Sequence, residues 1–139
     1  MTLMNGFLLD TNICIYLLKG QRGIVDKIEI AGCDNCFITD VTLAELWFGA
    51  YNSERIEQQK RGVVYLEQLF NVISIKDSVE LFGSNKAYLK SKGILIDDFD
   101  ILIGSTAIKH DLIMVTENVK HLSRLPGISV ENWANYSPS

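Results

Sequence analysis

The alternation of short apolar segments with longer amphipathic ones constrains the fold of this chain more than any other feature. Five short apolar segments are predicted as strands: 6–10, 36–39, 71–75, 112–116 and 128–132. Seven segments with helical spacing of apolar residues are predicted as helices: 11–20, 23–31, 40–51, 54–70, 77–93, 100–110 and 117–125. Strands that alternate with helices favour a parallel sheet covered on both faces. We therefore expect a three-layer α/β/α fold with a central parallel sheet of four to five strands.

The length and composition indicate one domain over residues 1–139. The chain of 139 residues is 47% hydrophobic and 22% charged, which is ordinary for a globular domain of this size. Neither of the two prolines, Pro126 and Pro138, falls in a segment that resembles a linker, and no internal repeat is visible.

The first residues and the cysteines favour a cytoplasmic protein. The stretch MTLMNGFLLD lacks the basic start of a signal peptide, and no apolar run approaches the ~18 residues of a membrane span. Cys14, Cys33 and Cys36 are an odd number of cysteines, which is most simply explained by reduced thiols. The Cys33-x-x-Cys36 spacing is that of a zinc ligand pair, but the further candidates, Cys14, His110 and His121, are not paired at ligand spacing. We expect these cysteines to pack around a turn before a strand.

The net charge of −4, from 13 basic and 17 acidic residues, argues against a protein that coats nucleic acid through bulk attraction. Any contact with nucleic acid must then depend on a specific site.

Three acids are poorly matched to their apolar surroundings. Asp10 ends the first predicted strand and suits the N-cap of the helix that follows, but Thr11 and Asn12 are equally good caps, so Asp10 can instead project from the end of the strand. Glu45 lies in the helix DVTLAELWFGAY, which is apolar nearly all round and therefore expected to be largely buried, with no cation three or four residues away.

The third acid, Asp100, lies in the stretch IDDFDILIGSTAI at 96–108. Asp97 or Asp98 suits the N-cap of this helix, which places Asp100 in the first turn, above a buried stripe of small and apolar residues. Carboxylates that converge in such surroundings require a proton or a cation to relieve their repulsion. Oxygen ligands without His or Cys favour Mg²⁺ or Mn²⁺, and we expect Asp10, Glu45 and Asp100 to share such an ion.

Four stretches in order carry a family resemblance over essentially the whole chain: LLDTNICIYLLKG at 8–20, ITDVTLAELWFGA at 38–50, IDDFDILIGSTAI at 96–108 and IMVTENVKHLSRLPGISVENW at 113–133. With these landmarks the sequence resembles the PIN-domain family, and specifically the VapC-type toxins of bacterial toxin–antitoxin pairs. The family's three acidic positions match Asp10, Glu45 and Asp100, with Asp98 as the nearest competitor for the third. A fourth polar position matches Asn118, whose amide is a weaker metal ligand than a carboxylate, so the number of metal ions stays open.

The resemblance implies a metal-dependent endoribonuclease in which a metal-activated water attacks the phosphodiester in line and leaves a 5′-phosphate and a 3′-hydroxyl. It also implies residues that orient water or phosphate oxygens, which are Thr11, Asn12, Thr116 and Asn118. Scattered cations are weaker candidates for contacts with the RNA backbone: Lys86, Lys90, Lys92, Lys109 and Arg124. The RNA that is cut is left open.

The implied partners are RNA, a small antitoxin that covers the acidic cleft, and a second copy of the chain in a homodimer. Apolar surface for these protein contacts would come from Tyr16, Trp47, Tyr51 and Phe48, although Phe48 is expected to lie in the core.

Other functions fit the residues less well. A phosphatase of the haloacid-dehalogenase type needs an acid two residues after Asp10, where this chain has Asn12. A receiver-like module needs a phosphoacceptor after a central strand, and Lys76-Asp77 is a poor match. A PIN-like housekeeping nuclease and a catalytically silent metal-binding or interaction module remain as alternatives.

Overall fold

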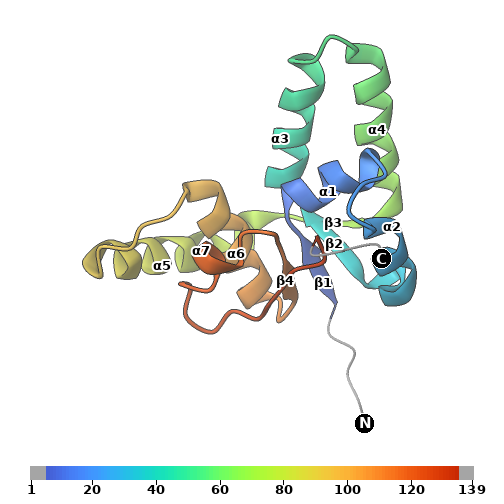
Figure 1. Cartoon of the computed structure of the whole chain (residues 1–139). Helices are drawn as coiled ribbons and strands as arrows, with labels where there is room; N and C mark the ends of the chain where they lie inside the picture. The colour runs from blue at the N-terminus through green and yellow to red at the C-terminus, as the bar shows by residue number, and fades with distance from the viewer. Residues whose placement is uncertain (1–5, 135–139) are drawn as a thin grey trace.

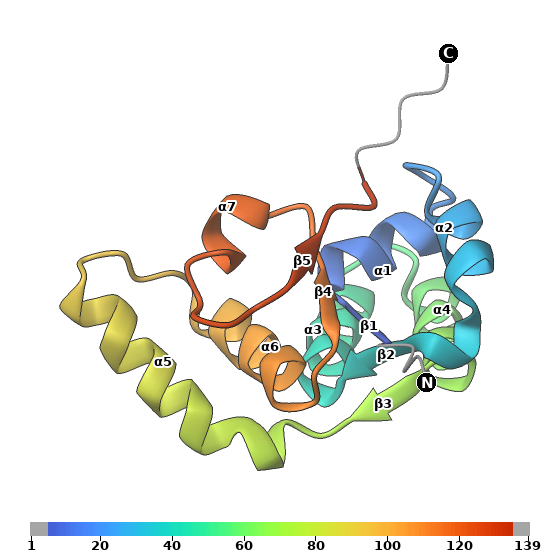
Figure 2. The ribbon, with the colours of Figure 1, turned by 90° about the horizontal axis from the view of Figure 1, so that it is seen from below.

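A five-stranded parallel sheet forms the middle of the protein. The computed structural model describes residues 6–134. The strands lie in the order β3-β2-β1-β4-β5 (Figures 1 and 2), and their bounds are β1 Phe7–Leu9, β2 Cys36–Thr39, β3 Asn71–Ile73, β4 Ile113–Val115 and β5 Val130–Glu131. Every neighbouring pair is parallel. The predicted sheet is therefore confirmed, with five strands.

Helices cover both faces of the sheet and complete the predicted three layers. Their bounds are α1 Thr11–Leu18, α2 Ile24–Ala31, α3 Asp40–Tyr51, α4 Ile56–Leu69, α5 Val79–Ser91, α6 Asp98–Lys109 and α7 Val119–Leu122, with short 3₁₀ helices at Cys33–Asn35 and Ile75–Ser78. Consecutive residues of β1 serve opposite faces: Leu9 packs in the core beneath α1 to α4, and Leu8 packs in the core beneath α5 to α7. This alternation follows from the pleat of a strand, and both side chains are fully buried.

Several elements are shorter than their sequence patterns predicted. The strand expected over 71–75 ends at Ile73, because the Asp40 carboxylate accepts a hydrogen bond from Ile75 N at 3.2 Å and the Ser74 hydroxyl accepts one from Lys76 N at 3.1 Å. These bonds turn the chain into the second 3₁₀ helix. The helix expected over 117–125 is only α7, a single turn.

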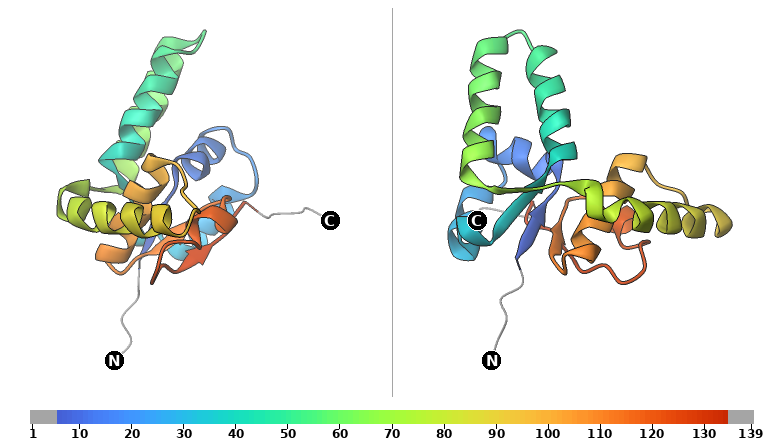
Figure 3. Two further views of the ribbon diagram at one scale, coloured as in Figure 1. Left: turned by 90° about the vertical axis from the view of Figure 1, so that its left-hand side faces the viewer. Right: turned by 180° about the vertical axis from the view of Figure 1, so that it is seen from behind.

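The expectation that α3 is largely buried was wrong. Only Thr42, Leu46 and Ala50 of α3 are buried, and Phe48, expected in the core, is 70% exposed. The physical reason is visible in Figure 3, where α3 and α4 form a hairpin that projects beyond the sheet. Each helix of this hairpin packs against the other, and the outer sides of both have no sheet to cover them.

Side chains cap the first turns of three helices, α1, α3 and α6. The Asp10 carboxylate caps α1, the Thr39 hydroxyl caps α3 by accepting from Thr42 N at 3.0 Å, and Asp97 caps α6 by accepting from Phe99 N at 3.1 Å. The sequence had left Asp97 and Asp98 open for α6, and Asp97 takes the role. The sequence had also left open whether Asp10 caps α1 or projects from the strand end; Asp10 caps α1 with one oxygen, and its carboxylate also lines the cavity described below.

Candidate active site

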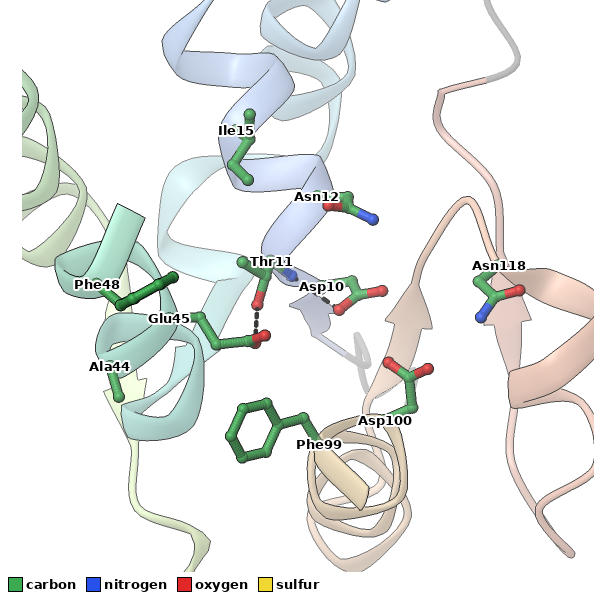
Figure 4. A pocket seen from close by; sticks show the side chains of 10 residues that line it. All are labelled: Asp10, Thr11, Asn12, Ile15, Ala44, Glu45, Phe48, Phe99, Asp100 and Asn118. Atoms are coloured by element: carbon green, nitrogen blue, oxygen red, sulfur yellow. Dashed lines mark hydrogen bonds between the residues drawn. The ribbon is translucent and has the colours of Figure 1, made fainter. Parts of the chain in front are cut away.

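A cavity of about 610 Å³ opens at the carboxyl edge of the sheet, beside the ends of β1 and β2. Figure 4 shows the side chains that line it: three acids (Asp10, Glu45, Asp100), three uncharged polar residues (Thr11, Asn12, Asn118) and four apolar residues (Ile15, Ala44, Phe48, Phe99). Ligands gather at this edge in open parallel sheets because the connecting segments leave crevices there. The structure thus brings the three predicted acids, which are far apart in sequence, to one cavity.

Asp10 is the most deeply placed of the acids, with 6% of its surface exposed. One carboxylate oxygen accepts from Thr11 N at 2.8 Å, and the other accepts from the Thr116 hydroxyl at 2.8 Å. Burial raises the pKa of Asp10, and these two hydrogen bonds oppose the rise because they stabilise the charged form. The strand end and the two donors therefore hold an ionisable carboxylate rigidly at the floor of the cavity.

Glu45 reaches the same cavity from α3. Its carboxylate accepts a hydrogen bond from the Thr11 hydroxyl at 2.6 Å, and that hydroxyl lies 3.1 Å from the hydroxyl of Thr42. Burial raises the pKa of Glu45, Thr11 opposes the rise, and the negative charges of Asp10 and Asp97 add to it. Glu45 thus has a fixed hydrogen-bond partner but lacks a compensating cation among the described residues.

Asp100 lies in the first turn of α6, across the cavity from Asp10 (Figure 4). Partial burial, together with the negative charges of Asp10, Asp97 and Glu45, raises the pKa of its carboxyl to about 6, although a hydrogen bond with Asn118 opposes the rise. The raised pKa means that the surroundings of Asp100 disfavour its charged form. The cluster would therefore gain stability from any bound cation.

The four polar residues predicted to orient water or phosphate differ in their contacts. The hydroxyls of Thr11 and Thr116 donate hydrogen bonds to the carboxylates of Glu45 and Asp10 respectively, so their observed contacts orient the acids. Asn118 donates its backbone N–H to the Thr116 hydroxyl at 2.9 Å, and its amide lies 3.0 Å from His121 Nδ1. Asn12 is exposed at the cavity wall. Contacts of these four residues with water or phosphate stay a prediction.

Four apolar residues line the cavity although the sequence did not assign them to this site: Phe48, Phe99, Ile15 and Ala44. Sequence reasoning assigned apolar side chains to the core, and only the folded arrangement shows that these four border the acids. The sequence contained one signal for Phe99, which lies between Asp98 and Asp100 in the first turn of a helix whose buried residues begin at Ile101.

The donor chemistry suits a hard divalent cation, although the acids are not gathered into a finished site. Within residues 6–134, no three Asp, Glu, His or Cys side chains lie closely enough together to hold a metal ion as they stand. The acids nevertheless share one cavity, where the charge of Asp10 raises the pKa of both Glu45 and Asp100, which is the condition that a dication relieves. The residues therefore fit Mg²⁺ or Mn²⁺, and we expect binding to draw the carboxylates together.

The cations proposed for RNA contacts lie elsewhere. Among the described residues that line the cavity there is no Lys or Arg. Lys86 pairs with Asp98 at 3.0 Å, and Arg124 donates to the carbonyl of Ile94 at 3.3 Å. The cavity is therefore acidic and apolar, without a basic side chain of the described chain in its wall.

The cysteines do not enter this site. Cys14, Cys33 and Cys36 are free thiols, and Cys36 begins β2 directly after the 3₁₀ helix Cys33–Asn35, as the expected turn before a strand. In the part of the chain that the structure describes, helices are too short or too polar to cross a membrane.

The chain is similar to known proteins in both sequence and structure. The family model described as PIN domain matches residues 7–128. Ribonuclease VapC2 of Rickettsia felis is 32% identical over 91% of this chain and 97% of its own length, and the tRNA(fMet)-specific endonuclease VapC of Shigella flexneri is 30% identical over 92% and 98%. Among solved structures, DNA-bound VapBC from Salmonella typhimurium superposes with a TM-score of 0.86 at 30% identity, covering 94% of this chain and 99% of that one.

These matches agree with the architecture, since they extend over nearly the full sheet and all three acid-bearing elements. The chain belongs to the PIN-domain family and, within it, to the VapC ribonucleases.

Proposed function

We propose that this protein is the toxin of a type II toxin–antitoxin pair and that it hydrolyses RNA phosphodiester bonds with the help of Mg²⁺ or Mn²⁺. The observation that carries the metal dependence is the cavity in which Asp10, Glu45 and Asp100 meet without a neutralising cation from the described chain. The ribonuclease activity follows the VapC relatives, whose similarity spans more than nine tenths of the chain.

In this proposal Asp10 and Asp100 hold the ion, and Glu45 contacts it directly or through water. The bound ion supplies two effects, which are a lower pKa of an attached water and neutralisation of charge on the scissile phosphate. Thr116 and Thr11 orient the carboxylates of Asp10 and Glu45 through hydrogen bonds of 2.8 Å and 2.6 Å, the role that outer partners of metal ligands commonly have. Asn118 is positioned to hydrogen-bond a phosphate oxygen, a bound water or the ion itself. The products are a 5′-phosphate and a 3′-hydroxyl.

A catalytically silent binding module is the second candidate, because the three acids are not gathered at ligand distance in the structure. The two functions differ in one measurement. A nuclease cuts RNA after Mg²⁺ or Mn²⁺ is added and stops in EDTA, whereas a silent module binds without cutting.

The test uses purified protein, labelled RNA transcripts and paired variants of neighbouring acids. Asp100→Asn removes a proposed ligand, and Asp98→Asn is its matched control, because Asp98 lies two residues away on the same helix and forms an exposed 3.0 Å pair with Lys86. We expect Asp100→Asn to abolish cutting and Asp98→Asn to retain it. Equal cutting by wild type and Asp100→Asn would show that the acids do not carry the reaction.

The partners are proposed from the solved VapBC assemblies and from the surface of this chain. A groove of about 190 Å³ runs beside the acidic cavity between α1, α3 and α4, and its walls include Leu18, Leu46 and Val63. An apolar antitoxin segment laid in this groove, with a basic side chain placed over the acids, would block the cavity. We also propose that the toxin forms a homodimer. Growth arrest on expression of the toxin alone, relieved by coexpression of the small protein encoded beside it, tests the pairing.

A further inference from the structure

The wall of the acidic cavity contains two exposed phenylalanine rings. Phe48 of α3 is 70% exposed and Phe99 of α6 is 47% exposed, and both line the cavity that holds the three acids. Figure 4 shows both rings on the side of Glu45, away from Asn118. Single exposed apolar residues are common on protein surfaces. Two of them on different helices, bordering the same polar cavity, require a reason beyond chance exposure.

The charges of the cavity pose a problem for a polyanionic substrate. The wall carries three carboxylates and no Lys or Arg among its described residues, so the phosphates that flank the reacting one are repelled. Attraction of a bound ion acts on the reacting phosphate alone. The remaining affinity for RNA must then come from groups other than phosphates at this position.

Nucleobases are the part of RNA that an exposed aromatic ring binds well. Stacking of a base on an aromatic side chain contributes about 1–3 kcal/mol and depends little on the identity of the base. Bases within a duplex are stacked on one another and do not reach the rings of a protein, whereas unpaired bases in loops and ends can be splayed apart. The volume of about 610 Å³ is in the range of sites for small ligands, which admits individual nucleotides.

We infer that Phe48 and Phe99 are substrate-positioning residues that stack on unpaired bases next to the scissile phosphate. This inference depends on the proposed function, which it deepens by naming two side chains that hold the bases beside the reacting phosphate. The rings belong to α3 and α6, the helices that carry Glu45 and Asp100, so a base held by either ring stays in register with the acids. The cavity thereby combines recognition by aromatic rings with chemistry at carboxylates.

The kinetic test compares Phe48→Ala and Phe99→Ala on an unpaired oligoribonucleotide. We expect KM to rise about 10-fold for each variant, which corresponds to about 1.4 kcal/mol and lies within the range for one stacked base, while kcat changes by less than about 3-fold. Phe→Trp at either position should restore KM, and Phe→Leu, which keeps apolar bulk without a ring, should not. Tyr88→Ala is the matched control, since Tyr88 is an aromatic residue of 42% exposure outside the cavity wall.

A spectroscopic test separates this inference from the nuclease proposal. The fluorescence of 2-aminopurine, placed on either side of the cleaved bond, is quenched when the base stacks, and quenching is measurable in Ca²⁺ or Mg²⁺ whether or not the RNA is cut. Quenching by wild type that is lost in both alanine variants supports stacking, even if no cleavage occurs and the nuclease proposal fails.

The opposite results would overturn the inference. If wild type cuts RNA but the alanine variants keep the wild-type KM and quenching, the rings do not bind bases, while the nuclease proposal stands. If the variants instead lose affinity for the antitoxin alone, Phe48 and Phe99 are part of a protein-docking surface. Both side chains are largely exposed, so the variants are expected to fold, and thermal melting confirms this.

Discussion

Replacing Asp100 by Asn should stabilise the metal-free protein, because this acid is held in surroundings that disfavour its charge. Its pKa rises from 3.8 to about 6. A shift of that size corresponds to about 3 kcal/mol at most, at 1.36 kcal/mol for each pH unit. Since Asp100 is only partly buried, solvent screening reduces this to about 1–1.5 kcal/mol. With about 0.3 kcal/mol for each degree in a chain of 139 residues, Tm in EDTA should rise by about 3–5 °C.

The pH dependence gives the sign of the effect. The native state binds the proton of Asp100 more tightly than the unfolded state, so protonation stabilises the fold below a pH of about 4 and this contribution is lost as the pH rises through about 6. The advantage of Asp100→Asn should therefore be full above pH 6 and should vanish towards pH 4.

The assay is thermal unfolding followed by circular dichroism, in EDTA and in Mg²⁺, from pH 4 to pH 8. Mg²⁺ should raise the Tm of wild type and should raise that of Asp100→Asn much less, because ligand binding stabilises only a native state that has the site. Asp98→Asn, whose exposed pair with Lys86 contributes little, should behave like wild type. A lower Tm for Asp100→Asn in EDTA at pH 7, or an undiminished response to Mg²⁺, would refute the reasoning.

Other substitutions test single contacts. Gly83→Ala in α5, where an added Cβ meets nothing within 4 Å, should stabilise the protein by about 0.5–1 kcal/mol in urea unfolding. Gly104→Ala in α6 places a Cβ 2.4 Å from Leu125 Cδ1 and should be less stable than Gly83→Ala by more than about 1 kcal/mol; equal effects would mean that α6 and α7 repack freely. Thr116→Val removes the 2.8 Å hydrogen bond that orients the Asp10 carboxylate and lowers its pKa, so calorimetry should find weaker Mg²⁺ binding, and unchanged affinity would contradict this role.

Much of the fold was predictable because burial leaves a clear pattern in short parallel strands. Leu8 and Leu9 are both buried, one on each face, and such a pair reads as a continuous apolar run in the sequence. The acids were predictable for the converse reason, since a carboxylate within an apolar segment costs free energy unless it meets a compensating group. Asp10, Glu45 and Asp100 all come to one cavity.

The errors arose where the answer depends on what covers a surface. The apolar residues of α3 predict burial, but α3 and α4 project beyond the sheet and leave Phe48 exposed. No local sequence pattern indicates where a helix extends beyond the elements that would cover it. The rings of Phe48 and Phe99 were missed for the same reason. The missing side chain of Gly104 lets Leu125 and Leu122 pack closely against α6, a tertiary contact that sequence spacing does not reveal.

The placement of the acids at helix beginnings affects how stable their charged forms are when no cation is bound. Asp10 caps α1, Asp97 caps α6 and Asp100 follows in the first turn of α6, where the unpaired backbone N–H groups of a helix carry a partial positive charge. That partial charge offsets part of the mutual repulsion of the carboxylates without the need for a basic side chain. The helix ends therefore stabilise these carboxylates whether or not a cation is bound.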